Sequence, residues 1–123
     1  MEEIKSDPQK VERAFLVGIQ EPRMTAEEAE EHLEELASLT DTMGVGVTGQ
    51  IVARVGNPLP RYYLGKGKAD EIKMLAESEE ADVLIFDMDL SPSQQRNWEE
   101  LTGIAVIDRQ EVILDIFAGR AQT

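Results

Sequence analysis

The chain has 123 residues, which is the length of a single ordinary domain. With 41% hydrophobic and 30% charged residues it can bury a core, which argues against both a disordered chain and a membrane-embedded one. Acidic residues outnumber basic ones by 25 to 12 and cysteine is absent, which excludes a basic DNA-coating protein, a disulfide framework and thiolate metal sites.

Strands and helices are predicted to alternate along the chain. The apolar run 14–19 is typical of a strand that is covered on both faces. Thr25 and Glu28 have the spacing of a capping box, and apolar residues then recur at helical intervals until Gly44 supplies a stop. The sequence therefore predicts a first strand followed by a long helix.

The middle of the chain repeats this order. Residues 45–55 are rich in β-forming residues and predict a long second strand. A loop is expected through residues 62–68, and apolar residues at helical spacing between 69 and 76 then predict a second helix. The run 83–86 is too apolar for a half-exposed strand, so we expect this third strand to be central.

Two more capping signals organise the last third. Ser91 and Gln94 form a second capping-box pattern, with proline between them at the first helical position, and this helix is expected to stop at Gly103. Residues 104–107 predict the fourth strand, and Asp108 then opens the last helix.

The last helix is apolar on more than one side. We therefore expect part of it to remain exposed, or to be covered by a neighbouring element or molecule. Its apolar residues are Val112, Ile113, Leu114, Ile116 and Phe117.

The alternating order predicts the fold class. Short connections and right-handed crossovers give a small three-layer α/β domain, a four-stranded and mainly parallel sheet with helices on both faces. We expect residues 1–12 to be a flexible N-terminal segment and residues 13–123 to form the domain. The start of the chain lacks an apolar signal region and no run approaches a membrane span, so we expect a cytoplasmic protein.

Residues 44–49 spell G-x-G-x-x-G, and Asp70 lies where a ribose-binding acid is expected. The surrounding pattern is wrong for a dinucleotide site, because these glycines follow a helix and enter a strand. Pyrophosphate binding needs a strand that runs into a helix N-terminus. We expect a helix stop followed by a strand with close backbone packing.

The stretch Gly65, Lys66, Gly67 and Lys68 precedes the second predicted helix and is a better phosphate-binding candidate. It is not a P-loop, because G-x-x-x-x-G-K-[ST] occurs nowhere in the chain. From Arg54 to Lys73 there are five basic and two acidic residues, with two tyrosines among them, so this loop can hold RNA phosphates and stack bases. A solvated, flexible loop explains the same pattern equally well.

Three other residues have simpler explanations than catalysis. Asp87, near Asp89 at the end of the third strand, is placed for Mg²⁺ or phosphoryl chemistry, but such acids more often prepare a helix start. His32 lies among six glutamates, as expected on a solvated helix face. Trp98 lies at helical spacing from other apolar residues and is expected in the core.

Residues 63–68, 90–97, 106–109 and 113–118 together resemble the N-terminal domain of HflX, a family of ribosome-associated GTP-binding proteins. The resemblance covers roughly residues 13–123. It implies that a helical hairpin and a GTPase domain follow Thr123, and that GTP and Mg²⁺ belong to that domain, with no cofactor in this chain. It also implies that the intact protein binds the large ribosomal subunit and its rRNA and separates stalled or stressed ribosomes.

We therefore expect a non-catalytic ribosome-binding module, with no metal site and no membrane span. The alternative is a phosphate- or adenine-nucleotide-binding enzyme domain that uses Gly65–Lys68 and Asp87. The residues expected to contact RNA are Arg61, Tyr62, Tyr63, Lys66 and Lys68, with Arg96, Asn97 and Arg109 at helix starts as further candidates.

Overall fold

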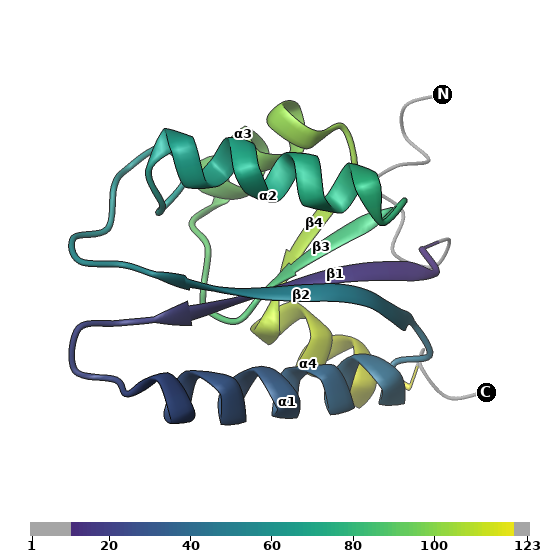
Figure 1. Ribbon diagram of the computed structural model, residues 1–123. Coiled ribbons are helices and arrows are strands. Elements are labelled where there is room, and N and C mark those ends of the chain that lie inside the picture. Colours follow the sequence, from purple (N-terminus) through teal and green to yellow (C-terminus); the bar gives the residue numbers. More distant parts are fainter. Residues whose placement is uncertain (1–10, 120–123) are drawn as a thin grey trace.

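Four parallel strands form one sheet in the order β2-β1-β3-β4 (Figure 1). The computed structural model describes residues 11–119. The strands are β1 (Arg13–Gln20), β2 (Gly46–Arg54), β3 (Val83–Phe86) and β4 (Ala105–Asp108). The third strand lies beside β1 in the middle of the sheet, and all four of its residues are buried, as predicted.

Helices cover both faces of this sheet. In Figure 1, α1 (Ala26–Thr42) and α4 (Arg109–Phe117) lie below the strands, and α2 (Lys66–Ser78) and α3 (Pro92–Thr102) lie above them. The chain is therefore the three-layer α/β fold that the order of predicted elements indicated.

Side-chain caps fix where the helices begin. Thr25 and Glu28 exchange hydrogen bonds with each other's backbone N–H groups, each 3.0 Å long, and Ser91 and Gln94 do the same at α3. Both predicted capping boxes are confirmed. They end the two loops that leave β1 and β3.

The folded unit starts before β1. Val11 is buried, and the backbone N–H groups of Glu12 and Arg13 donate to the Asp82 carboxylate at 2.9–3.1 Å. The predicted flexible segment therefore does not extend to residue 12, and its residues 1–10 lie outside the described part of the chain.

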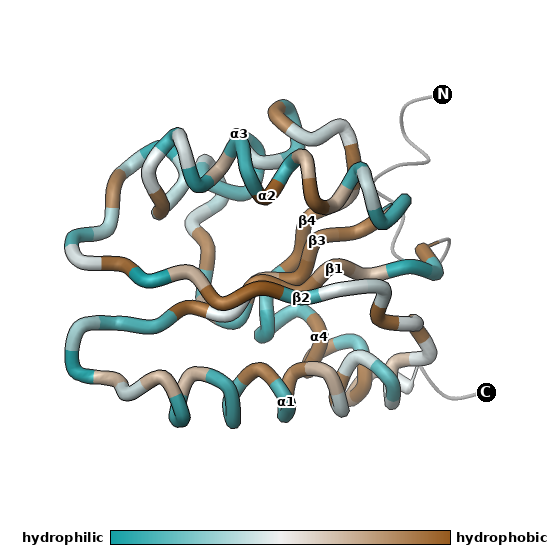
Figure 2. Tube along the Cα trace, viewed as in Figure 1, coloured by the Kyte–Doolittle hydropathy of each residue, from teal (hydrophilic) through white to brown (hydrophobic). Residues whose placement is uncertain are grey.

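Apolar residues run along all four strands and form a core on each side of the sheet (Figure 2). The core under α2 and α3 contains Trp98 and Phe86, whose side chains are fully buried. The opposite core contains Leu33 and Leu36 of α1. The expectation that Trp98 belongs to the core is confirmed.

The glycines of the G-x-G-x-x-G spelling have structural roles. Gly44 follows α1 with a φ of +92°, a conformation that favours glycine. A Cβ atom at Gly49 would lie 2.9 Å from Cε1 of Phe15, so glycine at this position leaves room for the Phe15 ring against β2. These residues lead into β2 and not into a helix, which confirms the predicted helix stop and strand, whereas the close contact at Gly49 is with side chains and not with backbone.

The last helix remains partly uncovered, as predicted. Val112 is fully buried, but the exposed fraction is 57% for Leu114 and 82% for Phe117. Between residues 11 and 119, every helix is too short or too polar to cross a bilayer.

Candidate nucleic-acid interface

The candidate residues gather around the edge of the sheet where the strands end. In open parallel sheets this edge carries the ligand-binding loops. Here the connection from β2 to α2, residues 55–65, lies beside α3. The predicted Arg61, Tyr62 and Tyr63 belong to that connection, and Arg96 and Asn97 belong to α3.

Residues 59–64 form a compact turn that is attached to α3. Leu59 and Tyr63 exchange two backbone hydrogen bonds of 3.0 Å. Two side chains of α3 bond to the backbone of this turn. Asn97 Nδ2 donates to the Arg61 carbonyl oxygen at 2.9 Å, and Trp98 Nε1 donates to the Tyr62 carbonyl oxygen at 2.9 Å. The sequence predicted a loop here, and the structure gives it a defined shape. We call residues 59–64 the braced turn.

The two tyrosines of the braced turn have different environments. The Tyr62 ring is buried against Trp98, with ring centroids 5.3 Å apart, so the prediction that Tyr62 stacks on a base is wrong. Tyr63 is half-buried, and its hydroxyl donates to Glu21 at 3.1 Å. Burial, followed by that hydrogen bond and the negative charge of Glu21, raises the pKa of the Tyr63 phenol.

Tyr63 also has a φ of +68°, which is uncommon for a bulky residue and costs about 1–2 kcal/mol. The hydrogen bonds between Leu59 and Tyr63 and the Tyr63 contact with Glu21 hold this conformation. Strained backbone of this kind is concentrated at binding and active sites. Sequence patterns carry no signal for this conformation at a tyrosine, so it was not predicted.

The predicted basic loop 65–68 is mostly helix. Gly65 is the N-cap of α2, and Lys66, Gly67 and Lys68 form its first turn. Each lysine has a carboxylate partner on the same helix, with Lys66 Nζ 3.4 Å from Asp70 and Lys68 Nζ 2.8 Å from Glu71. The lysines are therefore fixed on a helix end and not on a flexible connection, which corrects that interpretation.

Two arginines near the braced turn have no such partner. Arg61 and Arg96 are exposed, and within the described range neither guanidinium group has a carboxylate oxygen within 4 Å. The Arg61 guanidinium carbon lies 5.3 Å from the centroid of the Tyr62 ring, a cation–π arrangement. Asn97, by contrast, uses its side-chain amide to hold the turn. Arg61 and Arg96 are thus the cations of the predicted set without an ion pair inside 4 Å among residues 11–119. The positive charge of Arg96 also acts on Glu99 of the same helix, where it opposes the rise in pKa that burial causes.

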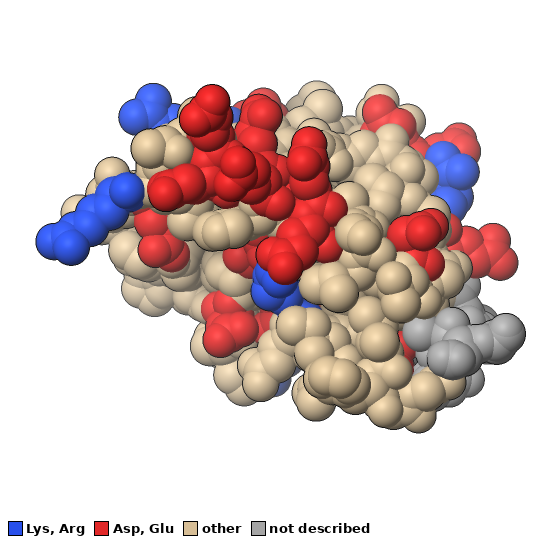
Figure 3. Space-filling model, turned by 90° about the horizontal axis from the view of Figure 1, so that it is seen from below, with Lys and Arg blue, Asp and Glu red and all other residues tan. Residues whose placement is uncertain are grey.

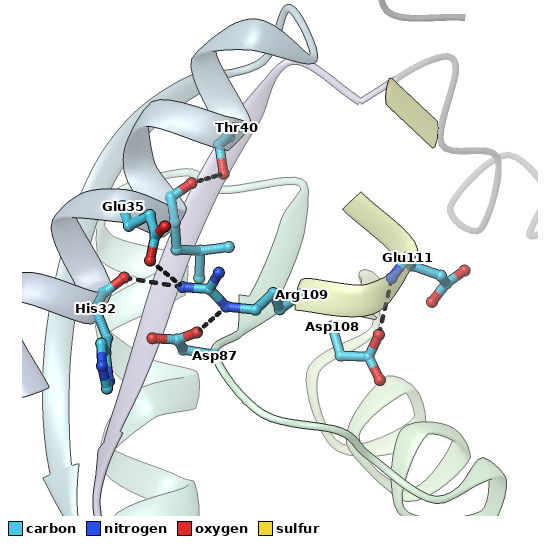
Figure 4. A network of polar contacts seen from close by, with 8 residues as sticks. His32, Glu35, Thr40, Asp87, Asp108, Arg109 and Glu111 are labelled. Atoms are coloured by element: carbon cyan, nitrogen blue, oxygen red, sulfur yellow. Dashed lines mark hydrogen bonds and ion pairs between the residues drawn. The ribbon is translucent and has the colours of Figure 1, made fainter. Parts of the chain in front are cut away.

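Arg109 belongs to a different network on the other side of the sheet (Figure 4). Its Nε donates to the Asp87 carboxylate at 2.6 Å, and a terminal nitrogen donates to the His32 carbonyl oxygen at 3.2 Å and lies 3.5 Å from Glu35. The guanidinium group therefore ties the start of α4 to the residue that follows β3 and to α1. Arg109 is not available as a free phosphate-binding residue, which corrects its predicted role.

Asp87 is almost fully enclosed in this network, with a side-chain exposure of 6%. Desolvation by burial raises its pKa, while the hydrogen bond and charge of Arg109, and more weakly His32, oppose that shift and Glu35 adds to it. The His32 side chain itself is exposed, as expected for a solvated helix face.

The structure does not assemble the alternative enzyme site. Gly65–Lys68 belongs to α2, whereas the Asp87 carboxylate is turned toward α1, so the two parts lie on opposite faces of the sheet. Among residues 11–119 there is also no cluster of three or more acidic or histidine side chains placed to hold a metal ion.

An open hollow of about 480 Å³ lies beside the loop that leaves β1. No sequence motif indicated it, because the loop contributes only a short polar stretch. Its lining has side chains of both signs and so favours neither an anion nor a cation. The lining residues are Glu21, Pro22, Arg23, Met24, Glu28 and His32.

Comparison with known proteins agrees with this architecture. A family described as GTP-binding GTPase N-terminal matches residues 30–118. "GTPase HflX" of Akkermansia muciniphila is 46% identical over 123 residues, covering 100% of this chain and 28% of that protein. "GTPase HflX" of Escherichia coli is 43% identical over 112 residues, covering 91% of this chain and 26% of that protein.

A GTP-binding protein from Sulfolobus solfataricus, solved in complex with GDP, has the same fold with a TM-score of 0.60 and 26% identity. The match covers 87% of this chain and 30% of that one. This chain spans roughly a quarter to a third of the length of these relatives. The resemblance drawn from the sequence is confirmed: the chain belongs to the GTP-binding GTPase N-terminal family, as the N-terminal domain of an HflX-type protein.

Proposed function

We propose that this chain is the non-catalytic, RNA-facing module of an HflX-type GTPase that binds the large ribosomal subunit and acts in ribosome splitting or rescue. The relatives are GTPases by name. We propose that GTP and Mg²⁺ bind a part of the full-length protein outside this chain. A ribosome-binding role goes with a proposed location in the cytoplasm.

The observation that carries this proposal is the braced turn, which includes Arg61, together with Arg96 on the neighbouring helix α3. A chain with a net charge of −13 is repelled by RNA at long range, so binding requires a local cationic surface. Guanidinium groups suit that task, because they bind phosphate oxygens in pairs and stack on bases. A rigid turn also loses little conformational entropy when it binds.

The two lysines of α2 are a second part of the same proposed surface. Their ion pairs are exposed and contribute at most about 1 kcal/mol, so RNA phosphate can replace the carboxylate partners. After that exchange the negative charges of Asp70 and Glu71 remain close to the bound phosphate and repel it. We therefore propose that Lys66 and Lys68 contribute less to binding than Arg61 and Arg96 do.

The double substitution R61A/R96A is expected to weaken binding to large ribosomal subunits and to flatten the slope of log affinity against log salt by about one to two units. The substitution K66A/K68A is expected to flatten it less. Co-sedimentation with the 50S subunit over a range of salt concentrations measures both slopes.

Lys73→Ala is the matched control for the lysine variant. Lys73 is also on α2 and also paired, with its Nζ 3.7 Å from the Glu77 carboxylate, but it lies two turns from the N-terminus of the helix. The slope of this variant is expected to match that of the unmodified protein. Unchanged slopes in both double variants would place the RNA contact outside this surface and contradict the proposal.

A separate prediction concerns α4, whose Leu114 and Phe117 we propose to pack against another part of the full-length protein. In the isolated chain, L114S/F117S is expected to reduce self-association measured by light scattering. The free energy of unfolding should change by no more than about 1 kcal/mol, because Phe117 is exposed and more than half of the Leu114 side chain is exposed. A loss well above that value in urea unfolding would show that they belong to the domain's own core.

A further inference from the structure

The two edges of the sheet differ in whether their backbone groups are covered. At the β4 edge, Gln95 Nε2 donates to the Val106 carbonyl oxygen at 2.5 Å, and the Val106 N–H donates to the Glu99 carboxylate. Side chains of α3 therefore occupy both backbone groups of Val106, in the middle of that edge. Covering an edge in this way prevents another strand from pairing with it.

The β2 edge has no such cover among residues 11–119. The Val55 N–H donates to the Gln20 carbonyl oxygen at 3.0 Å, so the backbone groups of Val55 face β1, and those of Ala53 and Ile51 do so as well. Because these directions alternate along a strand, the N–H and C=O groups of Gln50, Val52 and Arg54 face outward. Figure 1 shows β2 at the front of the sheet with no element in front of it.

This open edge also lacks the usual protection against pairing. Natural edge strands are shortened or carry charges or proline. β2 has 9 residues, contains no proline, and its only charged residue is Arg54 at its end. The irregularity opposite Ala14 and Phe15 comes near its start, so residues 50–54 are left as a regular strand. β2, the longest strand of the sheet, thus has backbone N–H and C=O groups along its outer edge that can pair with another strand.

Acidic side chains of α1 lie along one side of this edge. A hollow of about 210 Å³ lies between α1 and β2 and is lined by Glu30, Leu33 and Glu34 of α1 and by residues 50–52. The sequence of α1 contains seven acidic residues and no lysine or arginine. Figure 3, which views the face formed by α1 and α4, shows acidic side chains gathered into a band.

We propose that the open edge of β2 binds an extended strand of a partner protein, and that this strand carries basic side chains toward α1. Backbone hydrogen bonds from Gln50, Val52 and Arg54 provide the pairing, as in other cases of strand addition. Glu30 and Glu34 favour a strand whose side chains on the α1 side are positively charged. A second copy of this chain fits poorly, because pairing two β2 strands brings two acidic α1 helices together.

The probe is a ten-residue, end-blocked and fluorescein-labelled peptide in which lysine alternates with valine. Fluorescence anisotropy with the 123-residue chain is expected to show saturable binding that weakens as salt is added. The same peptide with glutamate in place of lysine is expected not to bind. Amide hydrogen exchange is expected to slow at Gln50, Val52 and Arg54 when the peptide binds, and not at Ala53, whose N–H already faces β1.

Two protein variants separate the backbone contribution from the charge contribution. Gln50→Pro removes one outward N–H on an exposed edge, where proline is tolerated, and should weaken binding about tenfold. Gln50→Ala is its control and should bind normally. The exposed pair E30Q/E34Q should weaken binding several-fold and reduce its salt dependence, and it keeps the test valid if the proline variant misfolds.

Three results would overturn the proposal. Equal binding of the lysine and glutamate peptides would remove the charge argument. Binding without slower exchange at Gln50, Val52 and Arg54 would show that the peptide lies elsewhere. Slow exchange at these positions without peptide, rising with protein concentration, would show that a second copy occupies the edge.

Discussion

Replacing Trp98 by alanine is expected to lower the free energy of unfolding by about 3–5 kcal/mol, which is the usual cost of removing a large aromatic side chain from a core. Trp98 is fully buried, and its ring centroid lies 4.8 Å from that of Phe86 and 5.3 Å from that of Tyr62. Because it is the only tryptophan, urea unfolding of the variant must be followed by circular dichroism.

The same substitution removes the indole donor to the Tyr62 carbonyl oxygen, so the braced turn should loosen. Amide exchange at Leu59 and Tyr63, whose N–H groups bond each other's carbonyls, is expected to become faster. Trp98→Phe is the control: it keeps most of the ring contacts and loses the donor, and should cost about 1–3 kcal/mol. An alanine variant as stable as the unmodified chain would contradict this account of the core.

The second large effect is expected from Arg109→Ala, which leaves the Asp87 carboxylate enclosed without its partner. We expect a loss of about 2–3 kcal/mol at pH 7, because an unpaired charge in a nearly closed site is more costly than a broken surface pair. Urea unfolding of the two proteins measures the difference. The double variant D87N/R109A is expected to recover part of it, since asparagine carries no charge.

The loss of stability caused by Arg109→Ala should become smaller as the pH falls. Burial already raises the pKa of Asp87 in the folded protein, and removing Arg109 takes away the main opposing influence. When the folded pKa is above the unfolded one, the ionised group opposes folding at neutral pH, and protonation relieves that cost. The gap between Arg109→Ala and the unmodified chain should therefore narrow as pH falls from 7 through the raised pKa. A gap that is constant over this range would show that Asp87 is not responsible.

Local patterns predicted most of the fold. The capping boxes at Thr25 and Ser91 and the apolar runs of β1 and β3 are signals contained in a few adjacent residues, and each was confirmed. The start of α2 was placed too late, because Gly65 and Gly67 are poor helix formers. Packing of Ala69 and Ile72 against the sheet outweighs that local preference and extends the helix back to Lys66.

The roles of individual side chains at the candidate site depend on distant residues. Tyr62 and Tyr63 are adjacent and chemically identical, yet one is buried by Trp98, 36 residues further along the chain. Arg109 is held by Asp87, 22 residues before it, and by the main chain of α1, 77 residues before it. No local pattern reports such pairings, so the sequence predicted candidate cations but not which of them are held by other residues of the domain.

The position of β1 in the sheet has a consequence for how the protein is made. β1 is synthesised first, but its two neighbours are β2 and β3, so its pairing with β3 must wait until residue 86 has been added. During that interval one edge of a strongly apolar strand is unpaired on the ribosome. The nascent chain should therefore need chaperone protection early, and the sheet should close only after most of the domain has been translated.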